Sequence, residues 1–283
     1  MWDVILPAVT ERHGVRYVDL VRFDDGTAHA ARDAVAVEAA LEVRVDGESF
    51  AVTMRTPGAD AELAAGFLFT EGLVSGAGDI VAVDARAGEH VVDVTLTPAA
   101  AVRATERRAT RRQVTTTSSC GMCGRPTLAS TQIDAPVIDT AWTVAATTIA
   151  VLPSRIGSRQ ATFAETGGLH AAALCAPDGT VLDAAEDVGR HNAVDKIIGR
   201  RLLAGTVPAG DALLFVSGRT SFEIVQKAWL AGVPIVAAVS APSSLAIDLA
   251  REAGITLVGF VRGGRCNVYT HPERVRAEQP VHA

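Results

Sequence analysis

Residues 213–261 read LLFVSGRTSFEIVQKAWLAGVPIVAAVSAPSSLAIDLAREAGITLVGFV and carry the pattern that decides the fold. Three short apolar runs in this stretch are rich in β-branched residues, which is typical of buried strands. Two segments with helical spacing separate them. Because strands connected through helices pair in parallel by right-handed crossovers, the stretch predicts a β-α-β-α-β unit with a parallel sheet. The predicted strands are Leu213–Ser217, Pro234–Ser240 and Thr256–Val261.

Hydroxyl residues and glycines mark the ends of the two helices in this unit. The first helix is expected to begin at Thr220, because Thr220 and Glu223 match a Thr-x-x-Glu capping box, and to stop at Gly232. The second is expected to begin near the pair Ser243–Ser244 and to stop at Gly254. Glycine is favoured just after the C-terminal end of each helix, because it readily adopts the left-handed conformation that terminates many helices.

A further helix is predicted upstream, over His191–Leu203, because apolar residues recur there at helical spacing and Gly205 follows. The apolar stripe consists of Val194, Ile197, Ile198 and Leu202.

The N-terminal part of the chain predicts a smaller α+β unit. Apolar residues alternate over 41–54 around the turn pair Asp46-Gly47, which predicts an antiparallel hairpin. Asp60 is placed to cap a following helix, and Gly72 is placed to end it. Two more strands and the apolar face of that helix complete the unit. They are Ile80–Asp84, Val91–Thr97, and the residues Leu63, Ala64, Phe67 and Leu68.

The composition is that of a soluble globular protein. The 283 residues include 26 basic and 32 acidic side chains, for a formal net charge of -6, and 48% are hydrophobic. A net negative charge gives no field that would gather nucleic acid or an anionic membrane over the whole surface, so an anion site has to be local. Apolar stretches are broken within about ten residues, and the first residues lack a secretory pattern. We therefore expect a cytoplasmic protein without a transmembrane helix.

The loops after the three predicted strands are the first candidate site. Ligands bind to open α/β sheets at the carboxyl ends of the strands, where loops and helix N-termini gather. The three loops are Ser217–Ser221, Ser240–Ser244 and Arg262–Arg265. They bring hydroxyls and three arginines, Arg219, Arg262 and Arg265, to one edge, and arginine forks match phosphate oxygens. The alternative is that these serines and glycines are only caps and turns.

The second candidate site is the pair Cys120 and Cys123 in Cys-Gly-Met-Cys. A zinc site is disfavoured because Cys175 and Cys266 stand alone, with no second pair of ligands. A thioredoxin-like pair would follow an apolar strand, but polar residues precede Cys120. An inert buried pair is disfavoured by the flanking glycines and hydroxyls, which indicate an exposed loop.

A nucleophilic thiolate that carries sulfur is the remaining interpretation of the cysteine pair. Neighbouring arginines would stabilise the thiolate if the loop brings them close, although charge runs are more often simply solvated. The arginines are Arg103, Arg107, Arg108, Arg111, Arg112 and Arg125.

Two further stretches hold ionisable residues, 166–172 with His170 and 186–196 with His191. A single histidine is more often structural than catalytic, and carboxylates near a helix start also serve as caps. The order of elements has some likeness to a deaminase. Base deamination is disfavoured, because the segment around His170 lacks the catalytic glutamate and no Pro-Cys-x-x-Cys follows.

Five ordered motifs resemble the FdhD family of formate dehydrogenase accessory sulfurtransferases. The resemblance runs from about residue 16 to residue 271, and Phe69-Thr-Glu-Gly-Leu73 matches as well. The motifs are Ser119-Cys-Gly-Met-Cys-Gly124, Glu186-Asp-Val-Gly-Arg-His-Asn-Ala-Val-Asp-Lys196, Ser217-Gly-Arg-Thr-Ser-Phe-Glu223, Ser240-Ala-Pro and Gly259-Phe260.

The segment patterns divide the chain into an N-terminal α+β domain over 1–112, an exposed CxxC loop over 113–127, and a domain over 128–283. The resemblance implies a cytoplasmic homodimer and the fold of the last domain. That last domain would be three-layered and cytidine-deaminase-like, with a largely parallel sheet and no metal. The resemblance further implies that a cysteine desulfurase supplies sulfur, which passes to the molybdenum bis(molybdopterin guanine dinucleotide) cofactor of formate dehydrogenase. The persulfide would form on Cys120, with Cys123 as its partner. The implied cofactor-binding residues are Phe260, Val261, Arg262, Gly263, Gly264 and Arg265.

The hypothesis that follows is a persulfide carrier whose cofactor lies on the rim of the sheet. Arg262 and Arg265 would bind phosphates, Gly263 and Gly264 would let the backbone approach closely, and Ser217 and Arg219 are secondary candidates. Two alternatives stay open: a thiol-disulfide oxidoreductase that uses the same cysteines, and a cofactor-binding chaperone without catalytic thiols.

Overall fold

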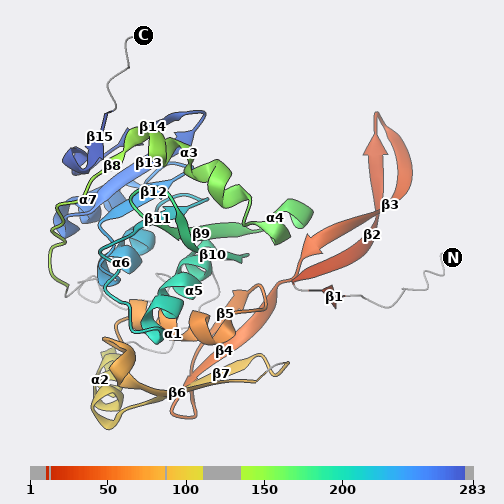
Figure 1. Cartoon of the computed structure of the whole chain (residues 1–283). Helices are drawn as coiled ribbons and strands as arrows, with labels where there is room; N and C mark the ends of the chain where they lie inside the picture. The colour runs from red at the N-terminus through yellow and green to blue at the C-terminus, as the bar shows by residue number, and fades with distance from the viewer. Residues whose placement is uncertain (1–10, 13, 87, 111–134, 278–283) are drawn as a thin grey trace.

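The computed structural model describes residues 11–12, 14–86, 88–110 and 135–277 (Figure 1). The cysteine pair and the 113–127 loop lie outside these residues. No helix in the described part of the chain is long and apolar enough to cross a membrane.

A six-stranded sheet forms the C-terminal half, in the order β10-β9-β11-β12-β13-β14. The three predicted strands β11, β12 and β13 pair in parallel, as expected. The other three pairings in the sheet are antiparallel. The sheet is therefore mixed rather than largely parallel, because two strands and a C-terminal hairpin strand flank the parallel centre. The strands are β9 (His170–Cys175), β10 (Val181–Asp187), β11 (Leu213–Val216), β12 (Ile235–Ala238), β13 (Thr256–Arg262) and β14 (Arg265–Val268).

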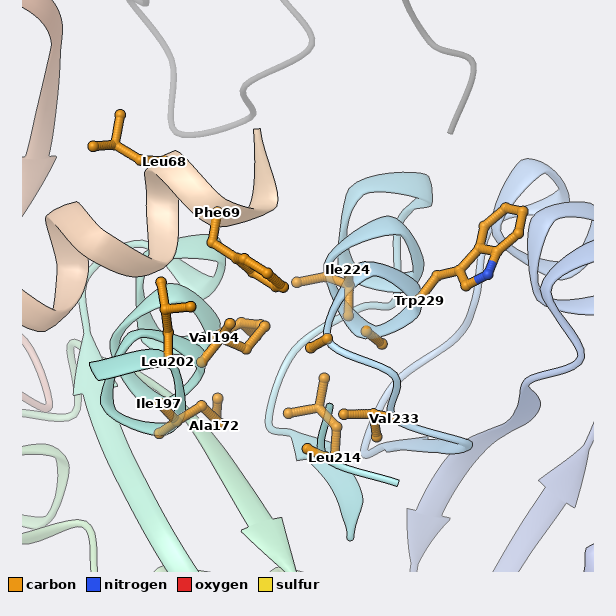
Figure 2. Close-up of a cluster of buried hydrophobic side chains, with 14 of the residues drawn as sticks. Leu68, Phe69, Ala172, Val194, Ile197, Leu202, Leu214, Ile224, Trp229 and Val233 are labelled. Atoms are coloured by element: carbon orange, nitrogen blue, oxygen red, sulfur yellow. The ribbon is translucent and has the colours of Figure 1, made fainter. Parts of the chain in front are cut away.

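Helices cover both faces of this sheet, giving three layers. Alternate residues of β11 point to opposite faces: Leu214 joins one core with α5 and α6, whereas Phe215 joins a second core with α3. Figure 2 shows the first core, where Leu214 and Ala172 of the sheet lie near Val194 of α5. The helices are α3 (Ala146–Gly157), α5 (Arg190–Leu203), α6 (Phe222–Leu230) and α7 (Ser244–Ala253).

The N-terminal α+β unit contains a four-stranded sheet in the order β5-β4-β7-β6. The predicted hairpin forms, and its turn residues Asp46 and Gly47 both have positive φ, 53° and 81°. This matches the Asp-Gly turn that the sequence favours. The elements are β4 (Ala39–Val45), β5 (Glu48–Arg55), α1 (Asp60–Thr70), a 3-10 helix (Ala77–Asp79), β6 (Ile80–Ala85), β7 (Val91–Leu96) and α2 (Pro98–Thr110).

Two of the predicted helix caps are wrong. Asp60 lies inside α1, whose cap position is Ala59, and its carboxylate binds the buried guanidinium of Arg55 at 2.8 and 2.9 Å. The capping box also fails, because the cap of α6 is Ser221 and the carboxylate of Glu223 binds His191 instead. The cap of α7 is Ser243, whose hydroxyl accepts from the amide of Ala246, as predicted.

The sequence did not predict the two-stranded arm that extends from the body in Figure 1. Strands β2 (Val15–Asp24) and β3 (Thr27–Ala36) pair over ten residues, and the short helix α4 (Ala161–Thr166) packs beside them. The remaining elements are β1 (Glu11–Arg12), β8 (Val144–Ala145), a 3-10 helix (Pro272–Arg274) and β15 (Val275–Arg276).

Candidate functional site

Backbone hydrogen bonds join the three loops at the carboxyl ends of β11, β12 and β13. The amide of Thr220 donates to the carbonyl of Ala241 at 3.2 Å, and the amide of Ser243 donates to the carbonyl of Thr220 at 3.0 Å. The amide of Phe260 donates to the carbonyl of Ser240 at 3.2 Å. The prediction that these loops gather on one edge is therefore confirmed. We call this edge the rim.

A surface pocket of about 220 Å³ lies at the β13–β14 end of the rim, lined by Phe260, Arg262, Arg265 and Asn267. The guanidinium carbon of Arg262 lies 5.5 Å from the centre of the Phe260 ring, within reach of a cation-π contact. Both arginines are exposed. Asn267 was not predicted; its place two residues after Arg265 puts both on one face of β14.

Gly263 and Gly264 form a tight turn, and their predicted close approach to a ligand stays a prediction. Both have positive φ, 59° and 76°, and they form the turn that joins β13 to β14, where Arg262 pairs with Arg265. A Cβ atom at either position would meet no atom within 4 Å, so the turn conformation, not crowding, favours glycine. The result is that the turn places two arginines next to each other.

Phe260 and Val261 lie where β13 departs from regular pairing. Phe260 has a φ of 55°, and the register of β13 with β14 shifts between Gly259 and Arg262. Such irregularities re-aim side chains at the ends of strands. Val261 is fully buried against the α3 side of the sheet, so its side chain cannot touch a ligand.

Ser217, Gly218 and Arg219 follow β11 on the same rim. The hydroxyl oxygen of Ser217 accepts from the amide of Ala171 at 2.9 Å, which ties the start of β9 to the end of β11. Ser217 therefore has a structural role, while its hydroxyl proton is still able to donate to a ligand. Arg219 is exposed.

Arg190 and His170 also lie at the rim, where the sequence did not place them. A Cβ atom on Gly218 would lie 3.4 Å from Cδ of Arg190 and 3.4 Å from Nδ1 of His170, so the three residues are neighbours. Burial and the charge of Arg190 lower the pKa of His170 below its ordinary value. The spatial convergence of β9, α5 and the β11 loop has no sequence pattern that would have indicated it.

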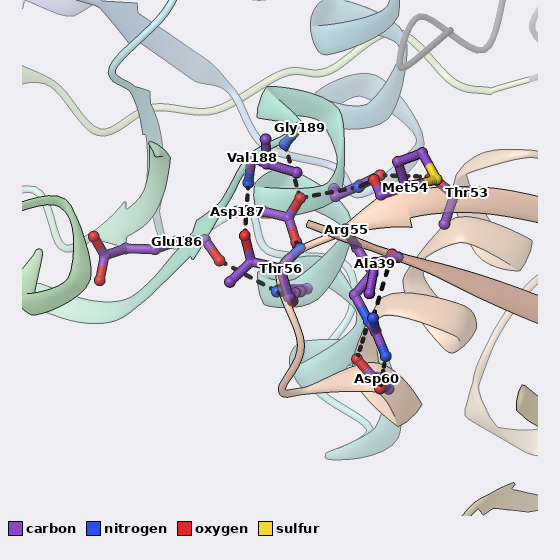
Figure 3. A network of polar contacts seen from close by, with 12 residues as sticks. Ala39, Thr53, Met54, Arg55, Thr56, Asp60, Glu186, Asp187, Val188 and Gly189 are labelled. Carbon is purple, nitrogen blue, oxygen red and sulfur yellow. Dashed lines mark hydrogen bonds and ion pairs between the residues drawn. The ribbon is translucent and has the colours of Figure 1, made fainter. Parts of the chain in front are cut away.

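The charged stretch 186–196 mostly joins the two halves of the chain (Figure 3). Asp187 is fully buried; its carboxylate accepts from the amides of Thr56 and Gly189 and lies 2.7 Å from Nζ of Lys196. Lys196 also donates to the carbonyl of Thr56 at 2.9 Å. These bonds tether β5 and the segment before α1 to the start of α5, so the stretch is largely structural.

A second buried pair lies between α1, α5 and α6. Nζ of Lys227 lies 2.8 Å from both carboxylate oxygens of Asp195, and the hydroxyl of Thr70 donates to the same carboxylate. His191, whose Nε2 lies 2.9 Å from Glu223, is buried beside this network. His191 is therefore held by α6 rather than exposed on the rim.

The four cysteines divide into two described and two undescribed residues. Cys120 and Cys123 lie outside the described part of the chain, so their geometry stays untested. Cys175 is buried, and burial raises the pKa of its thiol to about 12. Cys266 is half-buried, and burial raises its pKa as well. Neither thiol is suited to form a reactive thiolate at neutral pH.

Among the described residues, no three His, Cys, Asp or Glu side chains gather as a metal site requires. The absence of zinc at the cysteine pair stays a prediction, because that pair lies outside this part of the chain.

Comparisons with known proteins identify the fold and the family. A solved putative formate dehydrogenase accessory protein from Desulfotalea psychrophila has the same fold, with a TM-score of 0.72 and 24% identity over 92% of this chain and 98% of its own. The sulfur carrier protein FdhD of Anaeromyxobacter dehalogenans strain 2CP-1 is 51% identical over 265 residues, covering 89% of this chain and 91% of its own.

The sulfur carrier protein FdhD of Streptomyces coelicolor is 46% identical over 278 residues, covering 94% of this chain and 96% of its own. The class is thus a mixed α/β protein related to sulfur carriers over nearly its whole length. The profile of the FdhD/NarQ family matches residues 36–276, and the chain belongs to this family. The resemblance carried by the five motifs is confirmed.

Proposed function

We propose that this protein is a sulfurtransferase required for formate dehydrogenase activity. Its membership of the FdhD/NarQ family is the observation that carries the proposal, and relatives covering most of the chain are named sulfur carriers. A cysteine desulfurase supplies the sulfur, and the molybdenum bis(molybdopterin guanine dinucleotide) cofactor receives it. The protein works in the cytoplasm as a homodimer, and its C-terminal half has a cytidine-deaminase-like architecture.

Loading of sulfur takes place on Cys120 in this proposal. The Cys120 thiolate attacks the terminal sulfur of the donor's persulfide, the sulfur–sulfur bond of the donor breaks, and the donor cysteine leaves as a thiolate. The products are a Cys120 persulfide and a free donor cysteine, so no oxidant is consumed. Cys123 lies close enough in sequence to stabilise or share the sulfur.

The rim binds the cofactor that receives the sulfur. The pocket of Phe260, Arg262, Arg265 and Asn267 supports this assignment, because two adjacent guanidinium groups suit the phosphates of a guanine dinucleotide. Asn267 adds an amide that can both donate and accept, as a polar ligand requires. The tight glycine turn fixes the spacing of the two arginines.

Activation of formate dehydrogenase in cells that lack their own carrier tests the proposal. Wild-type protein is expected to restore activity, whereas Cys120→Ala is expected to abolish it although the variant folds normally. Cys266→Ala serves as the matched control and is expected to keep full activity. Normal activation by Cys120→Ala would leave a cofactor-binding chaperone as the explanation. Reduction of protein disulfides by the wild type, without sulfur loading, would indicate an oxidoreductase.

A further inference from the structure

We propose that the rim holds a second subsite for a phosphate-type anion, formed by Arg190, His170 and the Gly218–Arg219 turn. This subsite is separate from the pocket of Arg262 and Arg265. It builds on the proposed binding of a phosphate-bearing ligand at the rim, but it does not depend on sulfur chemistry.

The first observation is the close grouping of these residues from three elements. Arg190 is the first residue of α5, His170 is the first residue of β9, and Gly218 follows β11. A Cβ atom on Gly218 would lie 3.4 Å from both side chains, so Gly218 lies directly beside Arg190 and His170. All three residues are partly exposed, so a small anion can reach them.

The second observation is an unpartnered polar atom of Arg190. Its Nε atom is buried and has no hydrogen-bond acceptor among the residues that the structure describes. The nearby carboxylates are engaged elsewhere within the described residues: Asp187 binds Lys196 at 2.7 Å, and Glu186 accepts from the amides of Thr162 and Phe163. A buried polar atom without a partner is costly, and an anionic ligand would supply the missing acceptor.

The local potential also favours an anion. The groups that face His170 are Arg190, His191 and Asp187, and the charge of Asp187 is offset by its ion pair with Lys196. Arg219 comes next along the loop and is exposed. An arginine fork beside a neutral imidazole that can donate one hydrogen bond is suited to a phosphate or diphosphate group.

The second subsite lies at a different place on the rim from the Arg262 pocket. β12 lies between β11 and β13 in the sheet, and neighbouring strands lie about 4.8 Å apart, so β11 and β13 are roughly 10 Å apart. One extended ligand with two phosphate-bearing parts, or two separate anions, would fill the rim.

The test follows the His170 resonance in the full-length protein by NMR, using labelled histidine and His170→Gln to assign the signal. Inorganic diphosphate is expected to raise the pKa of His170, because a bound anion favours the imidazolium. Arg190→Gln is expected to raise the diphosphate concentration for half of this effect about tenfold, since a charge-assisted hydrogen bond is lost. Gly218→Ala is also expected to weaken diphosphate binding, because the added methyl group would lie against both Arg190 and His170. The methyl group makes only ordinary contacts, so the variant is expected to fold.

The controls separate this subsite from the first pocket. The double variant Arg262→Gln and Arg265→Gln is expected to leave the His170 response unchanged, as is Arg251→Gln on the exposed side of α7. A stronger response to guanosine diphosphate than to inorganic diphosphate would assign the subsite to a nucleotide, and an equal response would assign it to the diphosphate group alone.

Absence of any diphosphate effect on His170 would overturn the proposal. So would loss of the effect in the Arg262 and Arg265 double variant, because that would mean a single shared site. Sulfur loading by a desulfurase, measured on Arg190→Gln, keeps the two proposals apart. Normal loading of Arg190→Gln is expected, because the subsite takes no part in sulfur acceptance. Wild-type protein that loads sulfur but shows no diphosphate effect on His170 would remove only the subsite, and wild-type protein that fails to load sulfur would remove only the sulfur-carrier function.

Discussion

Charged side chains in the 186–196 stretch are buried as matched pairs. Lys196 and Asp187 have 4% and 0% of their side chains exposed. Three hydrogen bonds from Thr56, Gly189 and Asn192, together with the ion pair to Lys196, satisfy the carboxylate. Breaking such a pair on one side leaves an uncompensated charge in a low-dielectric interior. The stability of the junction between the two halves therefore depends on single residues.

We expect Lys196→Met to lower the free energy of unfolding by about 3–5 kcal/mol, because it leaves Asp187 buried without its cation. Urea unfolding measures this loss. Arg86→Ala is the control, since its pair with Asp84 is mostly exposed and is expected to change stability by less than about 1 kcal/mol. Equal losses of unfolding free energy for the two substitutions would show that the buried ion pair stabilises the protein no more than the exposed one.

The lowered pKa of His170 predicts a pH dependence of stability. The unfolded chain binds a proton near the ordinary histidine pKa of about 6.5, whereas the folded protein binds it only at lower pH. Stability is therefore expected to fall as the pH drops from above about 6.5 through the folded pKa. Unfolding at a series of pH values should show this slope, and His170→Gln should reduce it. If His170→Gln showed the same dependence of stability on pH as the wild type, His170 would not be the group that causes it.

Cys175 is expected to resist alkylation in the folded protein. Its pKa of about 12 leaves almost no thiolate at about pH 8, and the side chain is fully buried. Iodoacetamide treatment followed by peptide mass spectrometry should modify Cys175 only after denaturation. Rapid labelling of native Cys175 would contradict the structure and would reopen this thiol as a sulfur acceptor.

At the scale of elements, α1 and α5 approach closely through two glycines. A Cβ atom on Gly66 would lie 1.9 Å from the carbonyl oxygen of Asp195, and one on Gly199 would lie 1.8 Å from the carbonyl oxygen of Glu62. Both distances involve backbone atoms that cannot turn aside. The glycines therefore set the distance between the N-terminal unit and the C-terminal layers.

Gly66→Ala is expected to destabilise the protein by about 1–3 kcal/mol or more, because the helices must separate to admit the methyl group. Thermal unfolding measures the loss. Gly157→Ala in α3 is the matched control, since a Cβ atom there meets nothing within 4 Å, and it is expected to be neutral or slightly stabilising. A neutral Gly66→Ala would refute the close helix contact.

Local patterns predicted most elements, but not all of their partners. Strands β11, β12 and β13 and the ends of α5 and α7 follow from apolar spacing and glycine positions, which are properties of short segments. The caps at Asp60 and Glu223 were mispredicted because distant residues, Arg55 and His191, bind these carboxylates. Tertiary partners of this kind are not visible in a local pattern.

The antiparallel strands β9 and β10 of the large sheet, and the arm of β2 and β3, were not predicted, for a related reason. β9 is an alanine-rich run whose pairing with β10 and β11 depends on the whole sheet. Strands β2 and β3 are mostly exposed and lack the clear alternation that marks a half-buried strand. The gathering of the rim loops could be predicted, because the ends of parallel strands always meet, whereas the approach of Arg190 to Gly218 could not.

At the scale of the whole molecule, the residues that join the two halves are buried, whereas the residues proposed to bind a ligand are exposed. Buried ion pairs and the glycine contact join the N-terminal unit to the three-layered part. The exposed arginines lie on the rim of the mixed sheet, and the two described cysteines are poorly suited to react. Sulfur acceptance in the proposed function thus falls to Cys120 and Cys123.

Mapping the site of sulfur loading is the most direct test of this account. The full-length protein would be incubated with a cysteine desulfurase and labelled cysteine, alkylated, and digested for peptide mass spectrometry. We predict one labelled sulfur atom on the peptide that contains Cys120, and none on the peptides of Cys175 and Cys266. Label that is absent from the Cys120 peptide, or that is found only on Cys175 or Cys266, would contradict the central claim.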